Sequence, residues 1–229
     1  MRRALQYISD LHVDYLNKVP KLRPIAADLL ICGDIGDPRH KNFSTFLKNI
    51  QGDFSRIFLI PGNHEYDTSS CYSNKKVIEL RPYLYEALDK HHINLLDCTH
   101  FELDKDVIIG GCTLWSNPLK NLYNITKDRY EEHLKIHKLE KKFLQELINN
   151  NKQKKLIIGT HFVHTPQLIE KKYYINNQPS DWFHTNLEEM IKEPIIGWFC
   201  GHTHSNIKIN INKVTCGVNH GFKEEVFIY

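Results

Sequence analysis

Five short polar clusters hold the residues of this chain that are best suited to chemistry, and each follows an apolar run. The clusters are Ser9-Asp10-Leu11-His12, Gly33-Asp34-Ile35-Gly36-Asp37, Pro61-Gly62-Asn63-His64-Glu65, Thr160-His161 and Gly201-His202-Thr203-His204. The apolar runs are typical of buried strands. In open α/β sheets, ligands bind just beyond the carboxyl ends of the strands. The pattern therefore predicts that the five clusters form one shared site.

The residue types in these clusters are those that bind divalent metal ions. Histidine and carboxylate ligands favour Zn, Mn, Fe or Ni over a site made of sulfur alone. An aspartate can bridge two ions with its two oxygens, and Asn63 can bind only through its neutral amide oxygen. Asp10 and His12 are alternate residues, as are His202 and His204. We expect extended backbone there, which would point both members of each pair the same way.

Short apolar runs alternate with helical patterns along the chain, which predicts strands and the helices that cover them. The expected strands are 5–9, 29–32, 57–60, 107–109, 156–159 and 195–200, with hairpin-like strands beyond 205 and a last strand at the end of the chain. The expected helices are 42–50, 75–91, 127–150 and 187–192. We interpret residues 1–229 as a single α/β domain.

The longest predicted helix, 127–150, has an apolar stripe that should face the sheet. The stripe consists of Tyr130, Leu134, Leu139, Phe143 and Leu147. Several histidines outside the five clusters are expected to be solvated, namely His40, His91, His92, His100, His133 and His137.

Composition excludes several classes of protein. The 229 residues contain no stretch of 18 apolar residues and no apolar leader after Met1, which argues against a transmembrane helix and a signal peptide. The net charge of +3 is too small to indicate a nucleic-acid or membrane partner. Six widely spaced cysteines, with no C-x-x-C pair, are interpreted as reduced core residues of a cytoplasmic protein. They are Cys32, Cys71, Cys98, Cys112, Cys200 and Cys216.

Taken in order, the motifs Asp-x-His, Gly-Asp-x-x-Asp, Gly-Asn-His-Glu, Thr-His and Gly-His-Thr-His resemble those of the calcineurin-like metallophosphoesterase superfamily. They span residues 10–204. The segments that begin at Cys112 and His184 resemble small bacterial-type members. The resemblance implies a four-layer sandwich of two mixed β-sheets flanked by helices, and a phosphoesterase that uses two divalent ions.

Carried over by resemblance, one ion would be held by Asp10, His12, Asp34 and His204, and the other by Asp34, Asn63, His161 and His202, with Asp34 as the bridge. Manganese is the expected metal, with Fe, Zn, Ni and Mg as alternatives. A hydroxide held between the ions would attack phosphorus in line. His64 would serve as general acid or phosphate contact, and Asp37 would orient it.

The fourth motif departs from the Thr-His-His-x-Pro of many relatives. Here the chain reads Thr160-His-Phe-Val-His-Thr-Pro166. His161 directly follows the strand and is the preferred ligand, and His164 is either a substrate contact or a loop residue. Trp115 and Trp182 lie in two long connections, 113–126 and 165–184. They would either stack on a nucleobase or pack in the core.

The leading hypothesis for function is a phosphodiesterase that acts on a small molecule, such as a nucleotide. The Gly-His-Thr-His motif, the lack of an Asp-Arg-Gly signature and the modest length favour it. A phosphomonoesterase is the alternative. A non-catalytic scaffold on the same fold is a second class, but every motif position is filled here. A nuclease is disfavoured by the small net charge.

Overall fold

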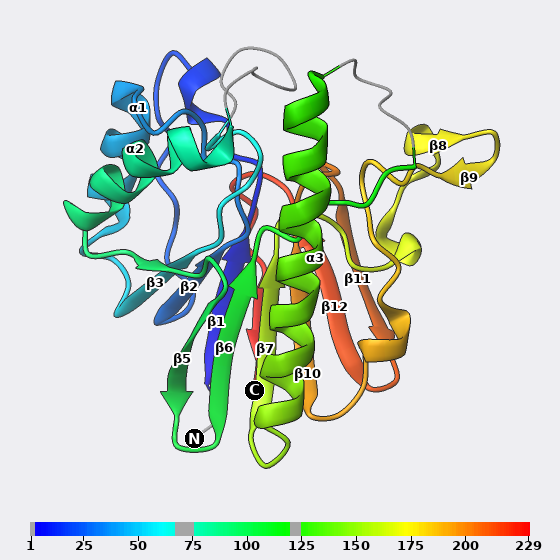
Figure 1. Cartoon of the computed structure of the whole chain (residues 1–229). Helices are drawn as coiled ribbons and strands as arrows, with labels where there is room; N and C mark the ends of the chain where they lie inside the picture. Colours follow the sequence, from blue (N-terminus) through cyan, green and yellow to red (C-terminus); the bar gives the residue numbers. More distant parts are fainter. Residues whose placement is uncertain (1–2, 67–75, 120–124) are drawn as a thin grey trace.

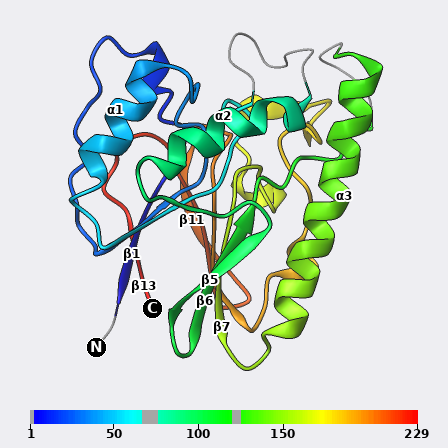
Figure 2. The ribbon, with the colours of Figure 1, turned by 60° about the vertical axis from the view of Figure 1, so that its left-hand side comes forward.

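Two β-sheets form the centre of the molecule in the computed structural model, which describes residues 3–66, 76–119 and 125–229 (Figures 1 and 2). The first sheet has the strand order β13-β1-β2-β3-β4. Its strands are β1 (Ala4–Ile8), β2 (Asp28–Ile31), β3 (Arg56–Leu59), β4 (Asn94–Leu95) and β13 (Val226–Ile228). Neighbouring strands from β1 to β4 are parallel, and β13 runs antiparallel to β1.

The second sheet has the order β11-β12-β10-β7-β6-β5. Its strands are β5 (Thr99–Asp104), β6 (Val107–Cys112), β7 (Lys155–Thr160), β10 (Ile195–Cys200), β11 (Asn206–Ile211) and β12 (Val214–Asn219). The four inner strands are mutually parallel, whereas β5 and β11 are antiparallel edges. A separate short hairpin joins β8 (Tyr174–Ile175) to β9 (Gln178–Pro179). The inner strands are apolar along their length because both of their faces are covered.

Helices complete the four layers that the resemblance implies. The helices α1 (Lys41–Ile50) and α2 (Val77–Asp89) lie against the first sheet, and α3 (Lys127–Asn150) lies against the second (Figures 1 and 2). The expected helix 187–192 is only a 3₁₀ turn, Glu188–Met190, because β10 already begins at Ile195. Within the described ranges, no helix has both the length and the apolar character needed to cross a membrane.

Each interface between layers has its own apolar cluster. Between the two sheets lie Leu5, Tyr7, Leu30, Phe58, Ile109, Ile157 and Phe199. The first sheet and its helices share a second cluster that includes Phe43, Phe46, Leu80 and Leu84. The second sheet and α3 share a third, which includes Ile108, Leu144, Leu147 and Trp198. These clusters hold the two sheets in fixed relation and therefore fix the strand ends that carry the polar clusters.

The face that α3 turns toward the second sheet differs from the predicted one. Its buried side chains are Arg129, His133, His137, Glu140, Leu144, Leu147 and Ile148, whereas Leu139 is 57% exposed. The polar members have partners on the segment after β6. Glu140 accepts a hydrogen bond from the Trp115 amide at 2.8 Å, and His137 Nδ1 donates to the Trp115 carbonyl. The expectation that His133 and His137 are solvated is therefore wrong, since hydropathy does not register such partners.

Candidate metal centre

The predicted ligands lie in loops at the carboxyl ends of five strands, β1, β2 and β3 of the first sheet and β7 and β10 of the second (Figure 1). Backbone hydrogen bonds tie these loops together in pairs. The Asp10 amide donates to the Gly33 carbonyl at 3.0 Å, and the Gly201 amide donates to the His161 carbonyl at 2.9 Å. The two sheets thus present their ligand loops at one common edge, as the sequence predicted.

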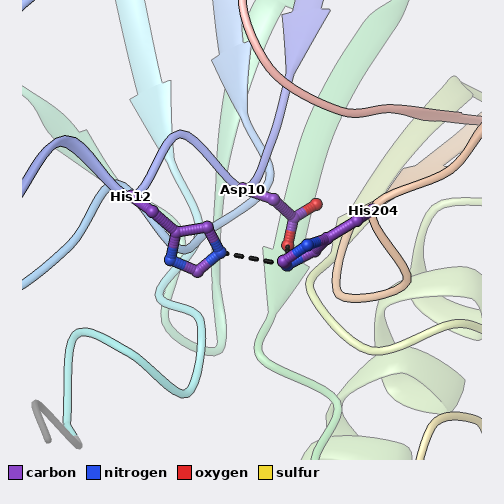
Figure 3. A group of neighbouring side chains, drawn as sticks. All are labelled: Asp10, His12 and His204. Carbon is purple, nitrogen blue, oxygen red and sulfur yellow. Dashed lines mark hydrogen bonds and ion pairs between the residues drawn. The ribbon is translucent and has the colours of Figure 1, made fainter. Parts of the chain in front are cut away.

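A first group of donor atoms consists of Asp10, His12 and His204, whose ligand atoms all lie within 4.8 Å of one another. The Nε2 atoms of His12 and His204 are 3.0 Å apart, and His204 Nε2 is 3.7 Å from Asp10 Oδ1. Figure 3 shows the His12 ring and the Asp10 carboxylate, from the loop after β1, converging with the His204 ring, from the loop after β10. Two imidazole nitrogens and a carboxylate oxygen that face one point match the donor set of a divalent ion.

A second group consists of Asp34, His161 and His202, again with ligand atoms within 4.8 Å. His161 Nε2 lies 3.3 Å from Asp34 Oδ2 and 3.0 Å from Asn63 Oδ1. Asp34 also belongs to a further group with His12 and His64. Its carboxylate therefore stands between the donor atoms of the β1 loop and those of the β7 and β10 loops.

The chemical state of the rings fits metal binding. The His161 Nδ1 donates to the Cys32 carbonyl at 2.8 Å, so Nε2, which faces Asp34 and Asn63, is the nitrogen that can coordinate a metal ion once its proton is lost. Burial lowers the pKa of His12 to about 4 and that of His204 to about 4. Both rings are therefore neutral at pH 7, which is the form that coordinates a metal.

The two aspartates carry opposite pKa shifts. Burial raises the pKa of Asp10 to about 7, with the His161 ring opposing that rise. Burial also acts to raise the pKa of Asp34, but His161 outweighs it and holds the Asp34 pKa well below its usual range. The proton on His161, whose own pKa rises to about 9 because Asp34 outweighs desolvation, supplies the positive charge that a metal ion would supply in its place.

The ligand segments are not extended as expected. Asp10 and His12 have φ angles of 55° and 44°, and His202 and His204 have φ angles of 70° and 47°. Asp34 adds a fifth left-handed residue, with φ at 56°. Left-handed backbone is uncommon for residues with a Cβ atom and concentrates at functional sites. Tight turns, and not the alternation of a strand, aim each pair of ligands.

Glu65 links the loop after β2 to the loop after β3 through backbone hydrogen bonds. Its buried carboxylate accepts hydrogen bonds from the amides of Gly62 at 2.6 Å, Asp34 at 2.9 Å and Ile35 at 2.7 Å. Burial raises its pKa to about 7, against the lowering effect of the amides. A Cβ atom at Gly62 would collide with Asp34 Oδ1, so the close approach of these loops requires glycine there.

His64 lies beside the first donor group. Its ring packs edge-on against that of His12 at 4.5 Å, and its backbone amide donates to Asp34 Oδ1 at 2.8 Å. Its Nδ1 is buried without a hydrogen-bond partner. Asp37, which was expected to orient His64, is instead held by Arg39 through Nε at 2.9 Å and the second guanidinium nitrogen at 3.1 Å. That bidentate ion pair takes up the carboxylate that the expected pairing needed.

The three aromatic residues named as substrate contacts are buried. Trp115 and Trp182 are each 1% exposed, and His164 is fully buried with its ring stacked on Trp198 at 4.4 Å. The structure shows core packing, the alternative left open for Trp115 and Trp182, and His164 is a buried residue of the loop that follows β7. Residues 120–124 of the first long connection lie outside the described residues.

Trp115 has a supporting position that sequence patterns missed. Its ring lies 5.5 Å from Phe162, which follows His161, and 6.3 Å from Tyr66, which follows the Gly-Asn-His-Glu motif. The polar face of α3 holds the same tryptophan through Glu140 and His137. The i, i+3 spacing of His137 and Glu140 is the only sequence signal of this support, and it is a weak one.

Two rings flank the donor groups on the solvent side. Tyr15 is 63% exposed, and its ring centroid lies 6.2 Å from that of His12 and 6.3 Å from that of His64. His220 stacks on His204 at 4.9 Å with an angle of 7° between the rings. Tyr15 lies outside the five motifs, so the sequence analysis did not single it out.

Comparison with known proteins agrees with this geometry. A family model described as calcineurin-like phosphoesterase matches residues 7–206. The chain is 31% identical, over 265 aligned positions, to the protein called uncharacterized protein L509 of Acanthamoeba polyphaga mimivirus. The alignment covers 97% of this chain and 92% of that protein.

Solved structures share the fold at low sequence identity. The phosphopantetheinyl hydrolase of Mycobacterium tuberculosis superposes with a TM-score of 0.70 at 15% identity, over 95% of this chain and 88% of the other. A dimetal phosphatase from Danio rerio gives a TM-score of 0.59 at 11% identity, over 97% of this chain and 88% of the other. At such identities the likeness concerns the arrangement of the two sheets and their helices.

Proposed function

The chain belongs to the calcineurin-like phosphoesterase family and is therefore a metal-dependent phosphoester hydrolase, and we propose that it is a phosphodiesterase acting on a small substrate such as a nucleotide. The observation that carries the proposal is the central place of Asp34. Its carboxylate belongs to one donor group with His12 and to another with His161 and His202. Only a group shared in this way can bridge two ions.

We assign the ligands of the two ions as follows. The first ion would be held by Asp10, His12, Asp34 and His204, and the second by Asp34, Asn63, His161 and His202. The separations of their donor atoms, the neutral rings of His12 and His204 and the tautomer of His161 support this set. Manganese is the proposed metal, because the set mixes imidazole nitrogens with carboxylate and amide oxygens.

The chain's own residues bind and orient the substrate and move the proton. When bound, two divalent ions lower the pKa of a water molecule and stabilise negative charge on phosphoryl oxygens. His64, fixed by its amide bond to Asp34 and by its contact with His12, is placed to give a proton to the departing alkoxide. Glu65 and Trp115 keep the loops in position without touching the reacting atoms.

The proposed preference for diesters over monoesters is supported by two aromatic rings beside the donor atoms, those of Tyr15 and His220. A diester carries two organic groups, and two rings flank the donor atoms, the exposed Tyr15 beside His64 and the half-buried His220 beside His204. The Tyr15 ring is 63% exposed, so a planar group of the substrate that reaches this edge of the site would contact an aromatic side chain. The cytoplasm is the proposed compartment, since the free thiols of Cys32, Cys200 and Cys216 are buried and unpaired.

Hydrolysis of bis-p-nitrophenyl phosphate and of p-nitrophenyl phosphate would test this proposal. Chelated protein would be reloaded with Mn, Fe, Zn, Ni or Mg, and kcat/KM would be measured for both esters with each metal. We expect manganese to restore the highest activity and the diester to be preferred. A preference for the monoester would indicate a phosphatase, and no hydrolysis of either ester with any metal would support a non-catalytic scaffold.

A further inference from the structure

We propose that Cys98 and Cys112 form a reversible redox pair that closes to a disulfide on exposure to peroxide. The two residues lie at the same end of the β5–β6 ladder, where Cys98 directly precedes β5 and Cys112 is the last residue of β6. Thr99 pairs with Gly111 in that antiparallel ladder, so one further step places Cys98 opposite Cys112. Cys98 itself directly precedes β5 and has a left-handed backbone, with φ at 55°, and its thiol lies close enough to that of Cys112 to accept a hydrogen bond from it.

The two thiols differ in the way that such a pair requires. Cys98 is exposed, whereas Cys112 is fully buried. A hydrogen bond from the Cys112 thiol lowers the pKa of Cys98. Burial, with that same bond, raises the pKa of Cys112 well above its usual value. Cys98 is thus the attacking thiolate, and Cys112 is the resolving thiol.

Cys98 opens into a cavity that a small oxidant can enter. The cavity has a volume of about 620 Å³, lies between α2 and α3, and is lined by Arg81, Tyr85, Lys135 and Glu140 among others. The hydrogen bond from Cys112 is the main influence that lowers the pKa of Cys98; burial and the adjacent Asp97 carboxylate oppose it, and Arg81 on this wall adds to the lowering. Cys32 in the inter-sheet core and Cys200 in the cluster of the second sheet are fully buried and have no such access.

A metal ion is a poorer explanation for this cluster. Asp97, Cys98 and Glu140 have ligand atoms within 4.8 Å of one another. The Asp97 carboxylate, however, is already paired with Arg81 at 3.1 Å and accepts from the Tyr85 hydroxyl at 3.0 Å. Glu140 accepts from the Trp115 amide. A cation would have to displace these partners, whereas a disulfide leaves them in place.

The reaction balances with hydrogen peroxide as the oxidant. The Cys98 thiolate attacks one peroxide oxygen, the O–O bond breaks, and the departing hydroxide takes a proton to become water. The Cys112 sulfur then attacks the sulfur of the Cys98 sulfenic acid. An S–S bond forms, the S–O bond breaks, and the hydroxyl leaves as water with the Cys112 proton.

Peptide mapping of the full-length chain tests the pair. The protein would be freed of reductant, treated with hydrogen peroxide without added redox-active metal, blocked with iodoacetamide and digested with trypsin. Cleavage after Lys105 separates Cys98 from Cys112. We expect a linked pair of peptides that contain these two cysteines, and its disappearance after dithiothreitol.

Three variants sharpen the test. Cys98→Ser should abolish the linked peptides and slow the oxidation of Cys112 by roughly tenfold or more. Cys112→Ser should leave a Cys98 sulfenic acid that dimedone labels. Cys71→Ser is the matched control and should behave as the unmodified chain; Cys71 itself lies outside the described residues. A linkage of Cys98 to Cys71 or to a second copy, or oxidation of Cys98 without any linkage, would overturn the proposal.

Discussion

Two groups of histidines in this molecule have pKa values that are lowered by the same cause, yet their roles differ. At the strand ends, burial lowers the pKa of His12 to about 4. On α3, burial lowers the pKa of His133 to about 3. The ring nitrogens nevertheless face different atoms. His12 Nε2 faces His204 Nε2 and the Asp34 carboxylate, whereas His133 Nε2 hydrogen-bonds the Ser116 hydroxyl at 3.2 Å.

The comparison teaches that neither burial nor a shifted pKa identifies a metal ligand. What separates the two groups is convergence. Donor atoms at the strand ends come from five loops and point at common positions. On α3, His137 is satisfied by the Trp115 carbonyl and serves packing. Predictions about variants in the two groups therefore differ in kind as well as in size.

The largest expected effect is that of Asp34→Asn. The amide cannot provide two anionic oxygens to two ions, so metal affinity should fall by more than the roughly 100-fold typical of outer-shell changes. Hydrolysis of bis-p-nitrophenyl phosphate should fall to the level of the chelated protein. Metal content after dialysis and kcat are the measurements. Glu140→Gln, a buried carboxylate on α3, is the control and should keep both ions. Full metal content in Asp34→Asn would contradict the assignment of the bridge.

The second largest expected effect is the loss of kcat in His64→Ala. Both ions should stay bound, because no coordination bond is removed, and kcat should fall by about 10²–10⁴-fold, the range of a general acid. The loss should be larger for a diester with an alkyl leaving group than for one with p-nitrophenolate. Asp37→Asn should change kcat much less, since Asp37 pairs with Arg39.

Metal analysis of the same variant separates the two possible roles of His64. Its donor atom lies within 4.8 Å of those of His12 and Asp34. Loss of one ion on substitution by alanine would therefore make it a ligand. Retention of both ions with unchanged activity on a poor leaving group would exclude the acid role.

The smallest expected effect is a loss of stability in a variant of the α3 histidines. His137→Ala removes the donor to the buried Trp115 carbonyl and should lower the free energy of unfolding by about 1–3 kcal/mol, with kcat changed little. His12→Ala is the matched variant and should behave in reverse, with metal and activity lost but the stability of the chelated protein nearly unchanged. Urea unfolding in the presence of a chelator, together with metal content, checks both. If His137→Ala abolished metal binding, the separation between the two groups would fail.

The sequence determined the inner strands and the identity of the polar clusters, whereas the edge strands β4 and β5 were not predicted. The runs at 29–32, 57–60 and 195–200 fall on β2, β3 and β10 to within a residue, because an inner strand of a covered sheet must be apolar throughout. The helix 127–150 was placed correctly for a similar reason, its long uninterrupted helical pattern. The order of the five motifs was sufficient to indicate the family, and the chain's position in that family supports the two-ion chemistry.

Tertiary structure alone decided how the clusters are aimed and which other polar residues are buried. The left-handed turns at Asp10 and His202 depend on contacts between loops that are far apart in the chain, such as the bond from the His202 amide to Asp10 Oδ1 at 2.9 Å. The partner of Asp37 and the buried face of α3 were likewise misjudged from the sequence. A hydropathy scale assigns a free-energy cost to the burial of each polar side chain. That cost is largely removed when the side chain forms a hydrogen bond with a backbone group far away in the chain, and only the folded structure shows where such groups lie.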